Sequence, residues 1–165
     1  MRRPHVGDAS FYLDLMDDPD FHRNIGDRGL RDVAAMEIHI RDKLLTPFLN
    51  RGFGMWLVET RHDKQPIGVC GLVDRDGFEG LDLGYAFLSA HRGQGFATEA
   101  AGAVLEFSAN TLGITSLFAI VAPENIRSKK LLGKIGFTWR ERSVFPATGD
   151  PIEIYDWNIA ESLGA

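Results

Sequence analysis

The segment HRGQGFATEA, residues 91–100, places an arginine and two glycines where a strand gives way to a helix. Residues 81–88 before it are strand-like, and apolar residues recur at helical spacing from Ala97 to Leu112 after it. Residues 116–122 are then apolar in both registers, which indicates a strand buried on both faces. A strand, a helix and a buried strand in this order predict a right-handed βαβ unit.

Further helices and strands are predicted on either side of this unit. Asp8 is an expected N-cap for a helix that ends at Met16, where the run DDPD at 17–20 breaks it. Alternating patterns predict strands at 55–60 and 66–73. The chain closes with a helix over 125–135 and strands over 137–145 and 152–159. A second helix near the N-terminus is marked by apolar residues on one face: Val33, Met36, Ile40 and Leu44.

These elements predict an α/β fold of the mixed α+β kind, with one twisted mixed β-sheet and helices on both faces. The chain has 165 residues, of which 44% are hydrophobic, and this suits one core. Its seven prolines and eighteen glycines are dispersed, so no linker is marked. We therefore expect a single domain over residues 1–165.

The charge and cysteine content narrow the classes of function. A net charge of −5 argues against a nucleic-acid partner, and it fits a cationic substrate weakly. The single cysteine, Cys70, excludes an intrachain disulfide and favours a reducing compartment. No apolar run is long enough to span a bilayer, so we predict a cytoplasmic protein without a membrane partner. The five histidines show no metal-ligand spacing, and no metal is expected.

The glycine loop at 91–95 has two interpretations on the residues alone. Glycines at a strand–helix junction let the backbone approach an anion such as a pyrophosphate, at the positive end of the helix. The same Gly-x-Gly is also found in ordinary tight turns. A dinucleotide-binding fingerprint needs a glycine where the chain has Thr98, and the Gly-Lys-Ser/Thr of a P-loop is absent.

The motif RGQGFA at 92–97 resembles the Arg/Gln-x-x-Gly-x-Gly/Ala signature of the GNAT superfamily of N-acetyltransferases. Residues 81–100, PEN at 123–125 and LLGKIGF at 131–137 are similar in order and spacing to its RimJ/RimL-like branch. Relatives begin with an edge strand, whereas only MRRPHVG precedes the first predicted helix here. Either that strand is dispensable or the chain begins short of its natural start.

The resemblance implies acetyl-CoA as a co-substrate. Its pyrophosphate would lie on the loop and helix start, and its pantetheine arm between the strands at 81–88 and 116–122. Asn125 would meet the cofactor or substrate, although an ordinary helix N-cap explains this residue equally well. The implied cofactor-binding residues are Phe87, Leu88, Arg92, Gly93, Gln94, Gly95, Phe96, Ala97, Thr98 and Asn125.

Acetyl transfer to an amine needs a base, because only the neutral amine attacks. The first candidate is Asp82, on a strand face with small side chains, and the second is Glu79; the alternatives are a water relay and an ordinary sheet residue at position 82. Many relatives carry a tyrosine acid where this chain has Leu132, so the resemblance does not supply a tyrosine acid here. Ser128, one helical turn after Asn125, is the remaining catalytic candidate.

The sequence thus predicts an acetyl-CoA-dependent N-acetyltransferase that works by direct transfer in a ternary complex. The acceptor would be a primary amine, either a protein N-terminus or a small molecule such as a polyamine, an amino acid or a drug, and the protein a monomer or homodimer. The resemblance also implies that the loop expected between the first helices walls the acceptor pocket, with the residues Phe21, Arg23, Asn24 and Ile25. The alternative is a non-catalytic module that binds and senses acyl-CoA. Turnover, rather than CoA binding, distinguishes an acetyltransferase from such a module.

Overall fold

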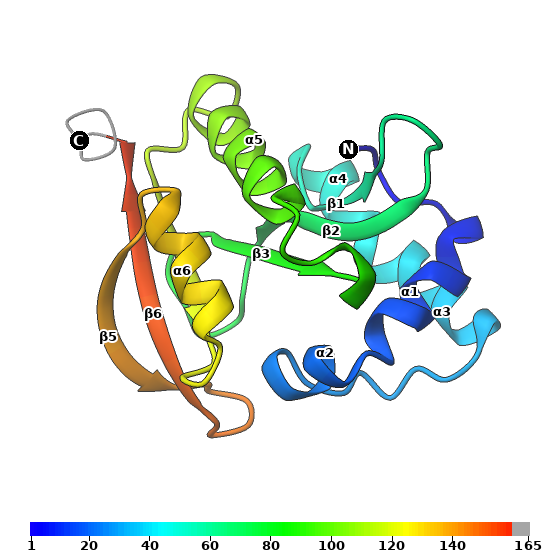
Figure 1. Ribbon diagram of the computed structural model, residues 1–165, viewed down its shortest axis with the longest axis horizontal. Helices are drawn as coiled ribbons and strands as arrows, with labels where there is room; N and C mark the ends of the chain where they lie inside the picture. Colours follow the sequence, from blue (N-terminus) through cyan, green and yellow to red (C-terminus); the bar gives the residue numbers. More distant parts are fainter. Residues whose placement is uncertain (160–165) are drawn as a thin grey trace. The chain divides into compact units, whose positions relative to one another are not determined.

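The computed structural model describes residues 1–159 and contains a mixed sheet with helices (Figure 1). The strands lie in the order β1-β2-β3-β4-β6-β5, and this confirms the predicted class of fold. The strands are β1 Met55–Glu59, β2 Pro66–Val73, β3 Asp82–Phe87, β4 Ser116–Val121, β5 Thr138–Val144 and β6 Pro151–Asn158. The α-helices are α1 Ala9–Met16, α2 Pro19–Asn24, α3 Val33–His39, α4 Thr46–Arg51, α5 Phe96–Asn110 and α6 Ile126–Lys134.

The chain divides into two compact units, and each is built from two separate segments. The first unit comprises Met1–Gly71 and Tyr85–Ala97, and the second comprises Leu72–Gly84 and Thr98–Ala165. The backbone therefore passes between the units three times, after Gly71, Gly84 and Ala97. That the whole chain acts as one domain stays a prediction.

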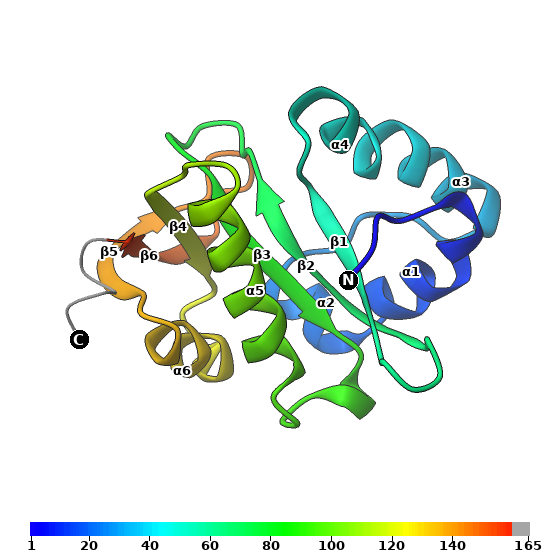
Figure 2. The ribbon, with the colours of Figure 1, turned by 90° about the horizontal axis from the view of Figure 1, so that it is seen from above.

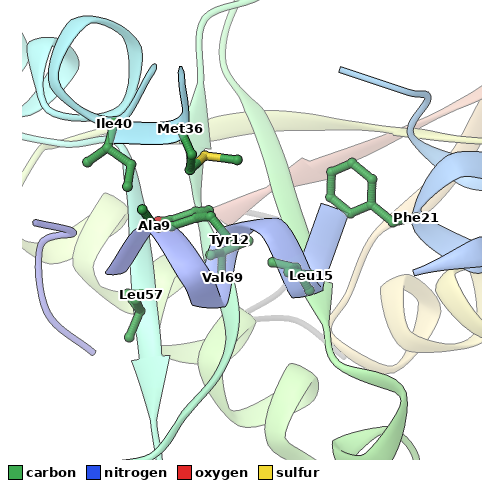
Figure 3. Close-up of a cluster of buried hydrophobic side chains, with 8 residues drawn as sticks. All are labelled: Ala9, Tyr12, Leu15, Phe21, Met36, Ile40, Leu57 and Val69. Atoms are coloured by element: carbon green, nitrogen blue, oxygen red, sulfur yellow. The ribbon is translucent and has the colours of Figure 1, made fainter. Parts of the chain in front are cut away.

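In the first unit, β1 and β2 pair antiparallel from Met55↔Gly71 to Glu59↔Pro66 (Figure 2). Arg2 adds a short bridge on β1 by exchanging two backbone hydrogen bonds with Leu57, at 3.0 and 2.9 Å. Apolar residues of α1 recur every three positions, so one face of this helix is buried (Figure 3). The buried cluster contains Ala9, Tyr12, Leu15, Phe21, Met36, Ile40, Leu57 and Val69.

Two details of this unit differ from the sequence predictions. The segment that was expected to be a loop at 21–25 is largely helical, because Asp18 caps α2 and Pro19 occupies its first turn. The second predicted helix is not continuous to Leu44. It is α3, followed by a π-helical turn over Ile40–Leu44, and its first residue Val33 is 46% exposed rather than buried.

In the second unit, β3 and β4 are parallel through the pair Asp82↔Phe118, and this confirms the predicted βαβ connection through α5. Strand β4 pairs antiparallel with β6. Strand β6 pairs antiparallel with β5, which lies beside it in Figure 1. The predicted final hairpin is therefore correct. Phe118, Ile152 and Ile154 form a small buried cluster on these strands.

Helix α6 of the second unit begins one residue after Asn125, whose side chain accepts a hydrogen bond from the backbone N–H of Ser128 at 3.1 Å. Lys129 ties this helix to β6 through an ion pair with Glu153, Nζ to Oε2 at 2.7 Å. This contact lowers the pKa of the Glu153 carboxyl. The start of α6 is thus fixed by a cap and an ion pair.

Within residues 1–159, no helix is both long enough and apolar enough to cross a membrane. The same part of the chain holds no group of three or more His, Cys, Asp or Glu side chains that could bind a metal ion. Cys70 is buried in β2, where burial raises the pKa of its thiol to about 12. The thiol is therefore protonated at neutral pH and unsuited to act as a nucleophile.

Candidate functional site

The glycine loop leads directly into the N-terminus of α5 and is exposed at Gly93, Gln94 and Gly95. Gly93 and Gly95 have φ angles of +75° and +91°, a region that side chains disfavour. A Cβ atom at either glycine would meet nothing within 4 Å. Over the described residues, the backbone N–H groups of positions 93–95 have no hydrogen-bond acceptor. Glycine at 93 and 95 therefore sets the backbone path and leaves open donors in front of a helix.

Arg92 lies at the start of this loop, and each of its three guanidinium nitrogens has an acceptor. Nε donates to the carbonyl of Phe87 at 2.8 Å. Nη1 pairs with Oδ2 of Asp20, and Nη2 with Oδ1 of Asp18, both at 2.8 Å. Burial opposes the ionisation of Asp18, but the hydrogen bonds from Arg92 and two backbone groups lower its pKa overall. The arginine that was predicted to meet the cofactor is thus already bound to carboxylates of the first unit.

The backbone at Phe87 and Leu88 also has internal partners. The Phe87 carbonyl accepts from Arg92, and the Leu88 N–H donates to the carbonyl of Ile67 at 3.0 Å. The Leu88 carbonyl accepts from the N–H of His91 at 2.9 Å, which forms the turn into the loop. Cofactor binding at these two residues stays a prediction, as it does for Phe96, Ala97 and Thr98 in the first turn of α5.

Asp82, the first candidate base, is 1% exposed at the start of β3 in the second unit. Its Oδ2 forms an ion pair with Nε of Arg75, and its Oδ1 accepts the backbone N–H of Ile120 at 3.3 Å. Burial raises the pKa of Asp82, and the charge and hydrogen bond of Arg75 and the hydrogen bond from Ile120 oppose that rise. A raised pKa makes a carboxylate a stronger base.

The contact with Ile120 replaces a backbone bond. Phe118 donates its N–H to the carbonyl of Leu81 at 3.0 Å, as in a regular parallel ladder. The next donor in that ladder, Ile120, would bond to the carbonyl of Leu83, but it bonds to the Asp82 side chain instead. The carboxylate therefore has a structural contact at the same place where a catalytic one is predicted.

The other catalytic candidates lie in different surroundings. Glu79 is exposed in the turn before β3, three residues ahead of the strand. Ser128 is half-buried in the first turn of α6, next to the cap made by Asn125. Leu132 is fully buried, so the position where relatives carry a tyrosine belongs to the core of this chain.

Some of the predicted site residues contact each other in the structure, and residues that the sequence did not indicate also contact them. Phe87 bonds to Arg92, and Asn125 bonds to Ser128. From the sequence we predict only a helix break at Asp18 and Asp20, although Asp-Pro-Asp is also the start signal of a short helix. Arg75 lies in a polar turn without any local pattern that points to Asp82.

The family is shown by comparison with known proteins. A family model described as an acetyltransferase (GNAT) domain matches residues 1–138. The chain belongs to the GNAT family of acetyltransferases.

Curated bacterial relatives agree with this family. The uncharacterized N-acetyltransferase p20 of Bacillus licheniformis is 28% identical over 166 residues, which cover 96% of this chain and 90% of p20. The uncharacterized protein YkkB of Bacillus subtilis (strain 168) is 28% identical over 107 residues, which cover 64% of this chain. That match spans 61% of the length of YkkB.

Solved structures share the fold. A chimera of the spermidine N-acetyltransferase SpeG from Vibrio cholerae and hSSAT superposes with a TM-score of 0.79 at 17% identity, over 99% of this chain and 97% of that one. The aminoglycoside acetyltransferase AAC(6')-Ib in complex with coenzyme A gives a TM-score of 0.76 at 17% identity, over 99% and 96% of the two chains. At these sequence identities, the similarity shows a shared fold and nothing more.

Proposed function

We propose that the protein transfers an acetyl group from acetyl-CoA to a primary amine by direct transfer in a ternary complex. Enzymes of the GNAT family use acetyl-CoA, which supplies the acetyl group as an activated thioester. The observation that carries the proposal is the loop at 93–95, with two glycines at positive φ and open N–H donors before α5. This arrangement fits the phosphates of a CoA molecule, because helix N-termini bind anions.

The chain's own residues would then handle the proton and the orientation of the reactants. As the amine nitrogen bonds to the acetyl carbon, the carbon–sulfur bond breaks with CoA leaving as its thiolate, and the amine loses a proton. We assign that proton to Asp82, directly or through a water relay, with Glu79 as the second candidate. Among residues 1–159, each oxygen of Asp82 has one hydrogen-bond partner, and a carboxylate oxygen can accept a second. Ser128 would orient the reactants, since a serine hydroxyl is a weak acid.

The acceptor is proposed as a primary amine, either on a small molecule or at a protein N-terminus, as in the RimJ/RimL-like branch. Two proteins that share this fold are a spermidine and an aminoglycoside acetyltransferase, and both of those names denote amine acceptors. The net charge of −5 is compatible with a cationic acceptor. A reducing, cytoplasmic setting is part of the same proposal.

Thermal unfolding with excess acetyl-CoA, ATP or NAD tests the cofactor. A ligand at about a hundred times its dissociation constant adds roughly 2.7 kcal/mol to the stability of a folded protein, which gives a clear shift in Tm. We expect this shift with acetyl-CoA alone. A thiol-release assay over amines and N-terminal peptides then tests transfer. Binding without turnover of any amine would favour the acyl-CoA sensor, and a shift with none of the three ligands would contradict both functions.

A further inference from the structure

One oxygen atom of Asp18 contacts both the start of α2 and the side chain of Arg92 in the first unit. Its Oδ1 accepts the backbone N–H groups of Asp20 and Phe21 at 2.9 and 3.3 Å, and these bonds cap α2. The same Oδ1 lies 2.8 Å from Nη2 of Arg92. Phe21 is buried in the core of the unit, so the helix start is itself fixed. The glycine loop is therefore tied to a packed helix through Arg92.

Asp20 strengthens this link from the first turn of α2. Its Oδ2 pairs with Nη1 of Arg92 at 2.8 Å, and its Oδ1 accepts from Nη1 of Arg23 at 2.9 Å. With the carbonyl of Phe87 on Nε, the guanidinium of Arg92 is held on three sides and is 22% exposed. Holding a planar group at three points fixes its orientation as well as its position.

We propose that Asp18 and Asp20 are positioning residues, which hold Arg92 and thereby fix the loop at 92–95 in the conformation that binds the phosphates of CoA. The inference rests on the proposed function, because it assumes that this loop binds CoA. Fixing a loop before its ligand arrives raises affinity by removing the entropy loss on binding.

Removal of the Asp18 or Asp20 charge should change the CoA affinity in the direction opposite to that expected from electrostatic repulsion alone. Two carboxylates near a phosphate site repel the ligand, so removal of their charge should tighten CoA binding if charge alone mattered. If the carboxylates position Arg92 and the loop, their removal weakens binding despite the lost repulsion. We expect Asp18→Asn to raise the Kd for CoA about tenfold, which is the equivalent of one charge-assisted hydrogen bond.

Asparagine is a suitable replacement because it is as good an N-cap as aspartate, so α2 remains capped while the ion pair is lost. Asp17→Asn is the matched control: it removes the same charge at the preceding, exposed residue. The CoA affinity of Asp17→Asn should be unchanged or slightly higher than that of the wild type. Isothermal titration with CoA gives each Kd, and the Tm of each free variant checks that the fold is kept.

A double-mutant cycle separates positioning through Arg92 from a general structural effect. Arg92→Gln should weaken CoA binding alone, and Asp18→Asn should add little to it, because the carboxylate acts through the arginine. Additive losses would overturn the proposal. So would an Asp18→Asn variant that binds CoA as tightly as Asp17→Asn. Failure of the wild type to bind CoA would overturn the proposed function and this inference together, whereas wild-type binding with an unaffected Asp18→Asn overturns the inference alone.

Discussion

The Asp82 carboxylate accepts the backbone N–H of Ile120, Oδ1 to N at 3.3 Å, in place of the next bond of the β3–β4 ladder. The predicted base is thus also part of the sheet. A substitution at this position must separate the two roles, and asparagine does so because its amide oxygen can still accept from Ile120.

Asp82→Asn should lower kcat by about 10²- to 10⁴-fold, as expected for loss of a general base, with little change in the Kd for CoA. In the wild type, kcat/KM should rise with pH through the pKa of Asp82, which burial raises. This dependence should be lost in the variant. Steady-state rates across the pH range and CoA titrations measure both quantities.

Glu79→Gln tests the second candidate base, because it removes an exposed carboxylate only a few residues away. It should keep the wild-type pH profile, including any slope that arises from the acceptor amine. Equal losses of turnover and CoA affinity in Asp82→Asn would assign this residue to the structure alone.

Gly95→Ala should weaken CoA binding by about tenfold or more, because the loop can no longer keep its path and expose its donors. An alanine at a φ of +91° also destabilises the fold, by about 1–2 kcal/mol. Gly113→Ala provides the matched control after the other end of α5: its φ is +67°, and a Cβ there would also meet nothing within 4 Å. Both variants should lose similar stability, and only Gly95→Ala should lose CoA affinity, as measured by titration and thermal unfolding.

Ser128→Ala should reduce kcat about three- to tenfold, below the 10² of a full acid–base catalyst, with the Tm unchanged. The backbone N–H of Ser128 bonds to the cap at Asn125, and alanine keeps this N–H, so the helix start is kept. Thiol-release kinetics measure this effect. Full activity would remove Ser128 from the mechanism.

The two interpretations of Asn125 can be separated with a pair of variants. Asn125→Ala should cost about 1 kcal/mol through loss of the cap, whereas Asn125→Ser keeps a capping oxygen and the stability. If Asn125 also contacts the cofactor, Asn125→Ser should bind CoA more weakly while its Tm stays near that of the wild type. Unchanged binding would leave Asn125 as a cap.

The Asp8–Arg2 ion pair should make the first unit sensitive to acid. Burial alone would raise the pKa of Asp8, but hydrogen bonds from Arg2 and the His5 backbone lower it below 3.8. Its stabilising contribution is therefore complete at pH values above 3.8 and is lost as the pH falls through the lower folded-state pKa. Asp8→Asn should cost about 1–3 kcal/mol at neutral pH, with a difference from wild type that shrinks in this acid range.

Denaturant unfolding from neutral pH down to pH values below 3.8 measures this difference. Substitution of the exposed Asp14 by asparagine serves as the control and should not change the slope. A constant difference between wild type and Asp8→Asn throughout would contradict the assignment.

The elements that could be predicted from the sequence are those marked by local turn residues or by a repeated apolar pattern. The bounds of β2, Pro66–Val73, match the apolar run between two polar turns, and Gly93 and Gly95 marked the strand–helix junction correctly. Helix α2 was missed because its six residues are too few to show a periodicity. The π-helical turn at 40–44 was missed because Ile40 and Leu44 keep a helical spacing.

The partners of the site residues could not be predicted for a different reason. Arg92 is 72 positions away in sequence from Asp20, and no local pattern connects a loop arginine to a distant acid. An arginine side chain indicates an anionic ligand. In the structure, Arg92 binds carboxylates of the chain itself. Asp82 was placed on the correct strand, but its burial depends on a charge in the preceding turn, at Arg75.

The interleaving of the two units limits how the protein can be divided experimentally. Because residues 72–84 interrupt the first unit and residues 85–97 interrupt the second, no single uninterrupted stretch of the gene encodes either one. A truncation series therefore has no end point that isolates a unit, and ribosomal synthesis cannot finish the first before residue 97 has emerged. Separate study of the units requires a rearranged gene, with each pair of segments joined by a new linker.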